Sequence, residues 1–210
     1  MEKIKQNAIV KKIGFNRVVL LCVMVLLYLL FALITPMVKA NANFVSFARI
    51  VSLLKYAYFM GFLSLGVTFV IATGGIDFSI GPVMFCGALI SGYLLTSRGW
   101  PLIICLILCI LVGTAFGVLN GVLVSYAGLP SFITSMASMM LAKGIGSVFT
   151  KTQSVSWPQA GDANGWFRNL VGMKVGTTEI PTGLFILLLA AVICAVILNK
   201  TMAGRYILCI

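Results

Sequence analysis

The stretch VVLLCVMVLLYLLFALIT, residues 18–35, decides which kind of fold this chain can adopt. It is uncharged and almost wholly apolar, and Pro36 follows it directly. An α-helix rises about 1.5 Å per residue, so roughly 20 apolar residues cross the hydrocarbon core of a bilayer. The stretch therefore predicts a membrane-spanning helix that Pro36 ends.

The residues before this stretch predict its direction. Five basic residues precede it: Lys3, Lys5, Lys11, Lys12 and Arg17. Positive charge next to a first span is typical of the cytoplasmic side, so residues 1–17 are predicted to be cytoplasmic. A cleaved signal peptide is the alternative, because Ala40-Asn41-Ala42 has the small residues of a cleavage site. The apolar core of a signal peptide is usually only about 7–15 residues, which favours an uncleaved helix.

The composition extends this prediction to the whole chain. Of 210 residues, 61% are hydrophobic and 9% are charged, whereas soluble domains carry about 25% charged residues. The net charge of +11 arises from 15 Lys and Arg against 4 Asp and Glu. Outside the N-terminus the basic residues lie singly between apolar runs, which indicates contact with lipid headgroups and argues against nucleic acid as a partner.

Five more apolar runs follow the first, and together they predict an all-α, polytopic membrane protein with about six spans in residues 18–198. The predicted spans are 18–35, 49–73, 80–96, 100–126, 131–150 and 182–198. The polar stretch 151–181 is predicted to be an external loop, and residues 199–210 to begin a cytoplasmic loop, because alternate sides are counted from a cytoplasmic N-terminus.

The interruption GGIDFS, residues 74–79, is the first candidate functional segment. Asp77 is the one acidic residue between apolar spans, and an ionised carboxylate there costs about 2.5–3.5 kcal/mol on insertion scales. Gly74 and Gly75 permit backbone conformations closed to other residues, and Asp77 or Ser79 could cap the next helix. Two interpretations stay open: a capped turn at the membrane surface, or a broken helix that lines a translocation pathway.

Two polar or small-residue patterns in the next spans add candidates. Gly113, Gly117 and Gly121 recur every four residues, which predicts a helix face for close packing, and Asn120 beside it could bond another helix or a substrate. Ser131 and Thr134, with Ser135 and Ser138, follow one face of the fifth span. These hydroxyls either bond their own backbone or line a path for a hydroxyl-rich solute.

Residue types typical of catalysis are missing from the sequence. It contains no histidine, and its six cysteines lack the spacing of a metal or redox motif. We therefore expect no catalytic residues, no metal site and no cofactor. A phosphate-binding G-x-x-x-x-G-K-[ST] motif is also absent, so energy from ATP would have to come from a partner.

Several motifs, in order, resemble one family. Gly74-Gly75-Ile76-Asp77-Phe78-Ser79-Ile80-Gly81 is similar to the G-G-I-D-L-S-V-G signature of permease subunits of ribose/galactose/xylose-type ABC importers. The resemblance continues through four further segments: Gly117 to Gly121, Pro130 to Thr134, Lys143-Gly144, and Asn199 to Tyr206. Branched-chain amino-acid permeases share the architecture but usually differ at the Gly-Gly-Ile-Asp position.

The resemblance implies a type II-like transport subunit, not an enzyme, in a bacterial inner membrane. It would pair with a second permease copy or a similar permease. ABC ATPase subunits would bind ATP-Mg, and a periplasmic or lipid-anchored sugar-binding protein would deliver a monosaccharide or similar small polar solute. Gly74, Gly75, Asp77, Ser79, Asn120, Ser131 and Thr134 would shape the substrate pathway.

The chain departs from the family at its end. Members are longer and carry a cytoplasmic coupling loop after the segment that matches Gly204-Arg205-Tyr206, so a truncation before that loop is expected. We then expect this chain alone not to support ATP-driven uptake. The alternatives are a non-transporting remnant or assembly partner of a cognate permease, a branched-chain amino-acid permease and, least favoured, an ion-coupled secondary carrier.

Overall fold

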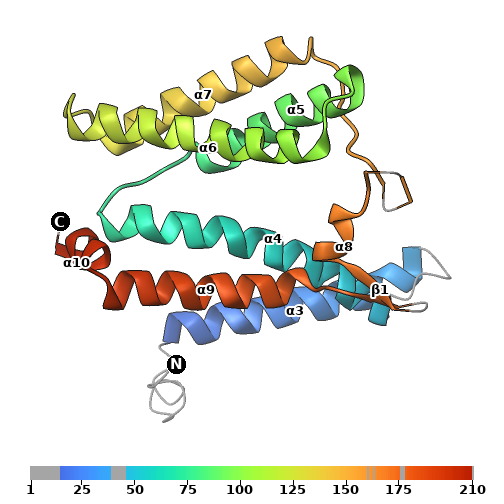
Figure 1. Cartoon of the computed structure of the whole chain (residues 1–210). Coiled ribbons are helices and arrows are strands. Elements are labelled where there is room, and N and C mark those ends of the chain that lie inside the picture. Colours follow the sequence, from blue (N-terminus) through green and yellow to red (C-terminus); the bar gives the residue numbers. More distant parts are fainter. Residues whose placement is uncertain (1–14, 39–45, 160, 163, 176–177, 210) are drawn as a thin grey trace. The chain divides into compact units, whose positions relative to one another are not determined.

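The computed structural model describes residues 15–38, 46–159, 161–162, 164–175 and 178–209 (Figure 1). The chain divides into two compact units, Met1–Leu53 and Leu54–Ile210. Helix α3, Phe15–Val38, lies in the first unit. Helix α4, Phe47–Ala72, begins in the first unit and continues into the second.

Helix α3 corrects one prediction. Pro36 does not end the helix but lies inside it, and α3 continues to Val38. A proline within a helix loses one backbone hydrogen bond, and so close to the end of α3 few helical bonds are affected. Just before it, the Thr35 hydroxyl donates to the carbonyl oxygen of Phe31 at 2.6 Å, which satisfies a polar side chain within the apolar run.

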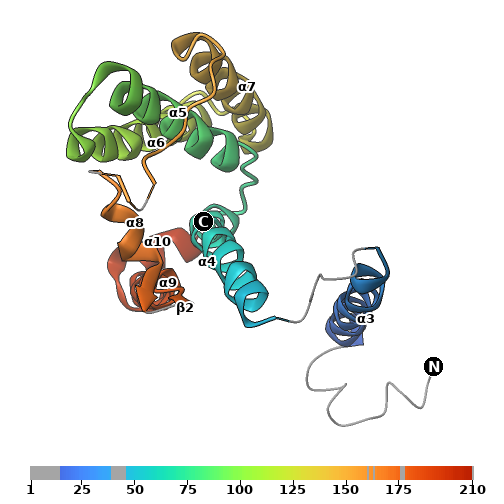
Figure 2. The same cartoon turned by 90° about the vertical axis from the view of Figure 1, so that its right-hand side faces the viewer.

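The second unit contains a cluster of three helices, α5 (Ile80–Arg98), α6 (Leu102–Ser125) and α7 (Ser131–Phe149). Both views show them side by side (Figures 1 and 2). Helix α6 runs back along α5, whereas α7 runs in the same direction as α5. Ring contacts mark the two ends of the α5–α7 pair: Phe78 meets Phe132 at 5.6 Å between ring centroids, and Tyr93 meets Phe149 at 6.0 Å.

Helix α5 is the centre of this cluster, and small residues explain its close contacts. A Cβ added at Gly87 would lie 3.3 Å from the carbonyl oxygen of Cys109 on α6, and one added at Gly146 on α7 would lie 3.6 Å from the Cα of Cys86. Glycine therefore lets both neighbours approach the backbone of α5. The buried hydrophobic residues of the cluster are Val83, Cys86, Ile90, Leu94, Leu95, Leu102, Cys105, Phe116 and Ala142.

The segment after α7 is more ordered than the predicted loop 151–181. It contains a short helix, α8 (Phe167–Val171), and an antiparallel hairpin of β1 (Met173–Val175) and β2 (Thr178–Ile180) with Lys174 opposite Glu179. The Trp157 indole N–H donates to the carbonyl oxygen of Ala88 on α5 at 3.2 Å. This loop is therefore fixed to the helix cluster.

Two helices complete the chain, α9 (Gly183–Lys200) and α10 (Met202–Cys209). The predicted start of a cytoplasmic loop at 199–210 is thus largely helical. The side assigned to it, like the sides of residues 1–17 and 151–181, stays a prediction.

Six helices in the described part of the chain are long and apolar enough to cross a membrane. They cover Val18–Met37, Arg49–Ala72, Ile80–Arg98, Leu102–Ser125, Ser131–Phe149 and Gly183–Lys200. Many of their large side chains are exposed, for example Leu33 at 71% and Ile110 at 69%. Such surfaces suit lipid tails and are uncommon on soluble proteins. The predicted class, a polytopic helical membrane protein with about six spans, is confirmed.

Candidate functional site

The candidate site begins where the chain leaves α4. Helix α4 ends at Ala72, and Gly74 follows with a φ of +73°, a conformation that glycine adopts without steric cost. The amides of Gly74 and Gly75 still donate to the carbonyl oxygens of Ile71 and Val70, at 2.9 and 3.1 Å. The backbone then extends to Ser79, the residue before α5, so a non-helical segment separates two apolar helices.

Asp77 forms a local turn within this segment. Its Oδ1 accepts hydrogen bonds from the backbone N–H and from the hydroxyl of Ser79, each at 2.6 Å. A carboxylate that accepts a bond from the amide two residues later is an Asx turn, which here leads into α5. Neither of the two expected caps is observed: Asp77 bonds only Ser79, the residue before α5, and the Ser79 hydroxyl makes no capping bond to the α5 backbone.

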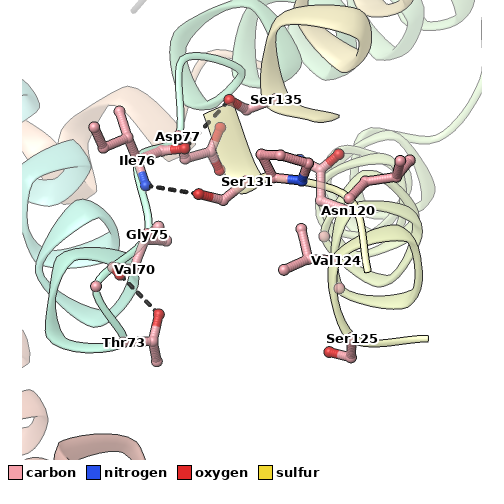
Figure 3. Close-up of a pocket in the computed structure, with 15 residues that line it drawn as sticks. Val70, Thr73, Gly75, Ile76, Asp77, Asn120, Val124, Ser125, Ser131 and Ser135 are labelled. Carbon is pink, nitrogen blue, oxygen red and sulfur yellow. Dashed lines mark hydrogen bonds between the residues drawn. The ribbon is translucent and has the colours of Figure 1, made fainter. Parts of the chain in front are cut away.

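Helix α7 holds the same segment from its other side. The Ile76 amide donates to the Ser131 hydroxyl at 3.1 Å, and the Ser135 hydroxyl donates to the Ile76 carbonyl oxygen at 3.3 Å (Figure 3). Backbone N–H and C=O groups that are shielded from water need hydrogen-bond partners, also where they lie outside a helix. Two serines one helical turn apart thus contact both polar groups of Ile76. The single Ser135 proton is shared with the carbonyl oxygen of Phe132, which lies 3.1 Å from the hydroxyl.

Asn120 on α6 connects the segment to α7. Its Nδ2 donates to the Ser79 hydroxyl oxygen at 3.1 Å, and its Oδ1 accepts a hydrogen bond from the Ser138 hydroxyl. A continuous chain of hydrogen bonds therefore runs from Ser138 through Asn120 and Ser79 to Asp77. It joins three helices around the non-helical segment, and Ser79 and Ser138 are each only 2% exposed.

A pocket of about 570 Å³ opens beside this chain of bonds. Ile76 and Asp77 line it from the break, Asn120 and Val124 face it from α6, and Ser131 lies between them on α7 (Figure 3). The lining is Val70, Thr73, Gly74, Gly75, Ile76, Asp77, Gly117, Asn120, Gly121, Val124, Ser125, Leu129, Pro130, Ser131 and Ser135. Its volume lies within the roughly 300–1,000 Å³ usual for small-molecule sites.

The structure brings together most of the predicted pathway residues. Gly74, Gly75, Asp77, Asn120 and Ser131 all line the pocket. Ser79 lies just behind it and lines an adjacent pocket of about 550 Å³, which it shares with Asp77 and Asn120. Thr134 differs, because it is 2% exposed and its hydroxyl donates to the carbonyl oxygen of Pro130 at 3.2 Å. Of the two roles expected for these hydroxyls, Thr134 bonds its own helix backbone and does not line the pocket.

The predicted glycine face of α6 meets no other helix among the described residues. A Cβ added at Gly113, Gly117 or Gly121 would meet no atom of the described residues within 4 Å. Gly117 and Gly121 instead line the pocket, and Gly113 and Gly117 line its neighbour. Within the cluster of α5, α6 and α7 the close contacts are at Gly87 and Gly146. The packing role of the α6 glycines stays a prediction.

Three residues that form hydrogen bonds in the site were not predicted as site residues from the sequence. Ser135 and Ser138 were recognised only as part of a hydroxyl face, and the backbone of Ile76 gives no sequence signal. The serine spacing of 131, 135 and 138 follows one helical face, but it does not tell which segment that face meets. The partners Ile76 and Asn120 lie 59 and 18 residues away, respectively.

The arrangement favours binding over catalysis. It presents a carboxylate, a carboxamide and several hydroxyls, which donate and accept hydrogen bonds but supply no activated nucleophile. Such groups, placed at a break between apolar helices, can form hydrogen bonds with a polar solute.

Comparisons with known proteins agree with this description. Residues 49–210 match the family described as the permease component of branched-chain amino acid transport systems. The fructose import permease protein FruG of Bifidobacterium longum is 31% identical over 159 residues, 73% of this chain and 46% of that protein. The ribose import permease proteins RbsC of Haemophilus influenzae and Bacillus subtilis are 28% and 31% identical, covering 85% and 84% of this chain and 54% and 53% of theirs.

The chain thus spans about half the length of these curated relatives. No solved structure matches it significantly. The predicted resemblance to sugar-importer permeases is confirmed, since the relatives named here are fructose and ribose import permeases. With its match over residues 49–210, the chain belongs to the family of permease components of branched-chain amino acid transport systems.

Proposed function

We propose that this chain forms part of the translocation path of an ATP-driven importer for a monosaccharide or a similar small polar solute. The observation that carries the proposal is the pocket at the α4–α5 break, where Asp77, Asn120 and Ser131 converge. Irregular backbone at membrane depth is tolerated only where it is buried in protein or lines a cavity. Here residues 73–77 of the non-helical segment line the pocket, and Ser79 at its end is 2% exposed.

The chemistry of the pocket supports a hydroxyl-rich solute. Sugar hydroxyls both donate and accept hydrogen bonds. The lining offers acceptor oxygens at Asp77 and Asn120, and hydroxyls that can donate or accept at Ser125 and Ser131. The relatives are named for ribose and fructose, whereas the family description names branched-chain amino acids. An amino acid would bring an ammonium and a carboxylate, and the lining contains no cation for the latter. Sugar is therefore the preferred substrate class.

The partners follow from what the sequence lacks. Because the chain has no phosphate-binding loop, separate ATPase subunits would bind ATP-Mg and hydrolyse it. A sugar-binding protein would deliver the solute, and a second permease copy or a similar permease would complete the path. The chain would lie in a bacterial inner membrane with its N-terminus in the cytoplasm.

Uptake by cells tests this proposal. Cells that lack the chain and cells that contain it in its native membrane are compared for uptake of radiolabelled ribose, fructose, galactose, xylose and leucine. Chain-dependent uptake of at least one sugar, abolished when cellular ATP is depleted, is the expected result. Chain-dependent uptake of leucine alone, or of sugar without a need for ATP, would contradict it.

A second candidate is an assembly partner that does not itself pass solute. The glycine face of α6 favours it, because Gly113, Gly117 and Gly121 face open space among the described residues and would accept a helix of another permease. Co-purification of the chain with an ATPase and a binding protein supports the first function. Co-purification with a permease alone, while substitutions in the pocket leave uptake unchanged, supports the second.

A further inference from the structure

A second pocket with polar side chains lies at the end of the three-helix cluster opposite the α4–α5 break. A pocket of about 370 Å³ opens there between the C-terminal ends of α5 and α7. Its lining residues are Tyr93, Leu94, Arg98, Trp100, Phe149 and Lys151. Two are cations and three are aromatic, and none is acidic. The pocket is separate from the translocation site, which lies at the start of α5.

The two cations lie at the ends of α5 and α7 but are not needed to cap them: Arg98 is the last residue of α5, and Lys151 lies two residues after α7. The α5 end is closed by Gly99, with φ +66°, and the amide of Trp100 donates to the Leu94 carbonyl oxygen at 3.1 Å. At the end of α7, the Thr150 hydroxyl donates to the carbonyl oxygen of Gly146 at 2.9 Å, and the Thr152 amide donates to that of Ser147 at 2.8 Å. Arg98 and Lys151 can therefore direct their charges to an external group.

Neither cation has an ion-pair partner in the described part of the chain. Of the three acidic residues there, Asp77 bonds Ser79 at the other end of α5, Asp162 accepts from the amide of Gln159, and Glu179 lies opposite Lys174 in the β1–β2 hairpin. Two unpaired cations around one pocket create a positive potential that an anion would neutralise. A matching anion must come from outside the described chain.

The backbone that positions Lys151 is held in an uncommon conformation. Lys151 and Thr152 have φ values of 52° and 57°, a region that non-glycine residues seldom occupy. Buried Thr150, 1% exposed, anchors the turn between them and α7. Strained residues persist where the surrounding structure fixes them, and they concentrate at functional sites. The position of Lys151 beside the pocket is thus fixed by the fold.

The aromatic residues place the pocket at a membrane interface. Both α5 and α7 are candidate membrane spans that end here, and Trp100 is 44% exposed beside the pocket. Trp and Tyr concentrate at the level of lipid headgroups, while Lys and Arg attract anionic lipids there. We propose that Arg98 and Lys151 form a binding site for a phosphate group, with an anionic phospholipid headgroup as the ligand that the interface position favours.

Tryptophan quenching tests this site. The purified full chain, with Trp157 and Trp166 replaced by Phe so that Trp100 is the only tryptophan, is placed in bilayers with brominated phosphatidylglycerol or brominated phosphatidylcholine at equal mole fraction. We expect the anionic lipid to quench Trp100 more strongly. A cation near the membrane surface favours anionic lipid roughly fivefold, so the double variant R98Q/K151Q should lose most of the preference.

Matched variants and a soluble probe separate the possible outcomes. K200Q/R205Q removes the same two residue types elsewhere and should keep the preference, and R98K should keep most of it. Circular dichroism shows whether each variant retains its helices. Inorganic phosphate, added without brominated lipid, changes Trp100 fluorescence only if the site takes free phosphate. Equal quenching by both lipids with no response to phosphate, or a preference that survives in folded R98Q/K151Q, would overturn the proposal.

Discussion

At the scale of single residues, Asn120 makes the contacts that join the site together. Among the described residues, it is the side chain that bonds both Ser79, next to the break, and Ser138 on α7. Its amide supplies a donor on one side and an acceptor on the other, which no apolar residue of similar size can do. The site thus depends on a polar side chain between two buried serine hydroxyls.

Asn120→Ala is expected to destabilise the purified chain by about 1–3 kcal/mol, because it leaves the buried hydroxyls of Ser79 and Ser138 without this partner. Thermal unfolding in detergent, followed by circular dichroism, measures the effect. Ser97→Ala on the exposed end of α5 is the control and should change stability little. In the double variant N120A/S138A the effects should be less than additive. Strict additivity would show that the two side chains do not interact.

Asp77 makes a second prediction at this scale, since its turn and its charge can be separated. Asp77→Asn keeps an oxygen for the Ser79 amide, whereas Asp77→Ala removes it. We expect Asp77→Ala to lower sugar uptake more than Asp162→Ala, which lies in the loop. If Asp77→Asn restores uptake, the turn suffices; if it does not, the charge is required. Equal uptake in Asp77→Ala and Asp162→Ala would contradict a special role for the break.

At the scale of elements, the sequence predicts where helices form better than how they pack. The apolar runs at 18–35 and 100–126 are unambiguous because a bilayer requires length and apolarity together. Packing depends on which faces meet, and glycines look alike in sequence whether they contact a helix or open space. In the cluster of α5, α6 and α7 the close contacts are at Gly87 and Gly146, whereas the regular spacing of Gly113, Gly117 and Gly121 predicts a packing face on α6.

The same limit applies to the candidate site. Asp77 and the two glycines before it stood out, because a carboxylate and a helix break are costly in a membrane. The partner segments could not be assigned, since the bonds of Ser135 and Asn120 join residues 59 and 41 positions apart. Thr134 also could not be separated from Ser131 by residue type, although only Ser131 lines the pocket.

A substitution at Gly92 tests the packing of the loop on α5. A Cβ there would lie 2.6 Å from a Val155 methyl carbon and 2.7 Å from the Trp157 indole nitrogen. Gly92→Ala should therefore displace the loop and lower the unfolding temperature, with a cost of about 1–3 kcal/mol. Gly113→Ala is the matched control, because it meets open space and gains helix propensity of up to about 1 kcal/mol. Equal stability of the two variants would contradict the observed contact.

At the scale of the whole molecule, the direction of the chain in the membrane is the main prediction. The basic N-terminus favours the cytoplasm, whereas Arg98 and Lys151 would both lie outside. Cysteines introduced one at a time at Asp162 and Lys200 distinguish the predicted topology from the inverted one. The experiment uses intact cells and chains whose exposed Cys22 and Cys209 are replaced by alanine. A membrane-impermeant maleimide should label the cysteine at 162 and not the one at 200. The reverse pattern would invert the topology.

The measurement that tests the translocation pathway most directly is protection of the pocket by substrate. A cysteine is introduced at Ser131, which lines the pocket, and another at Val148, which lies on the same helix and is 80% exposed. Cells are treated with a small polar methanethiosulfonate reagent, and sugar uptake is measured with and without substrate present during the treatment. We predict that modification at 131 blocks uptake, that substrate slows the block, and that modification at 148 does neither. Uptake that is unchanged after complete modification at 131 would contradict a path through this pocket.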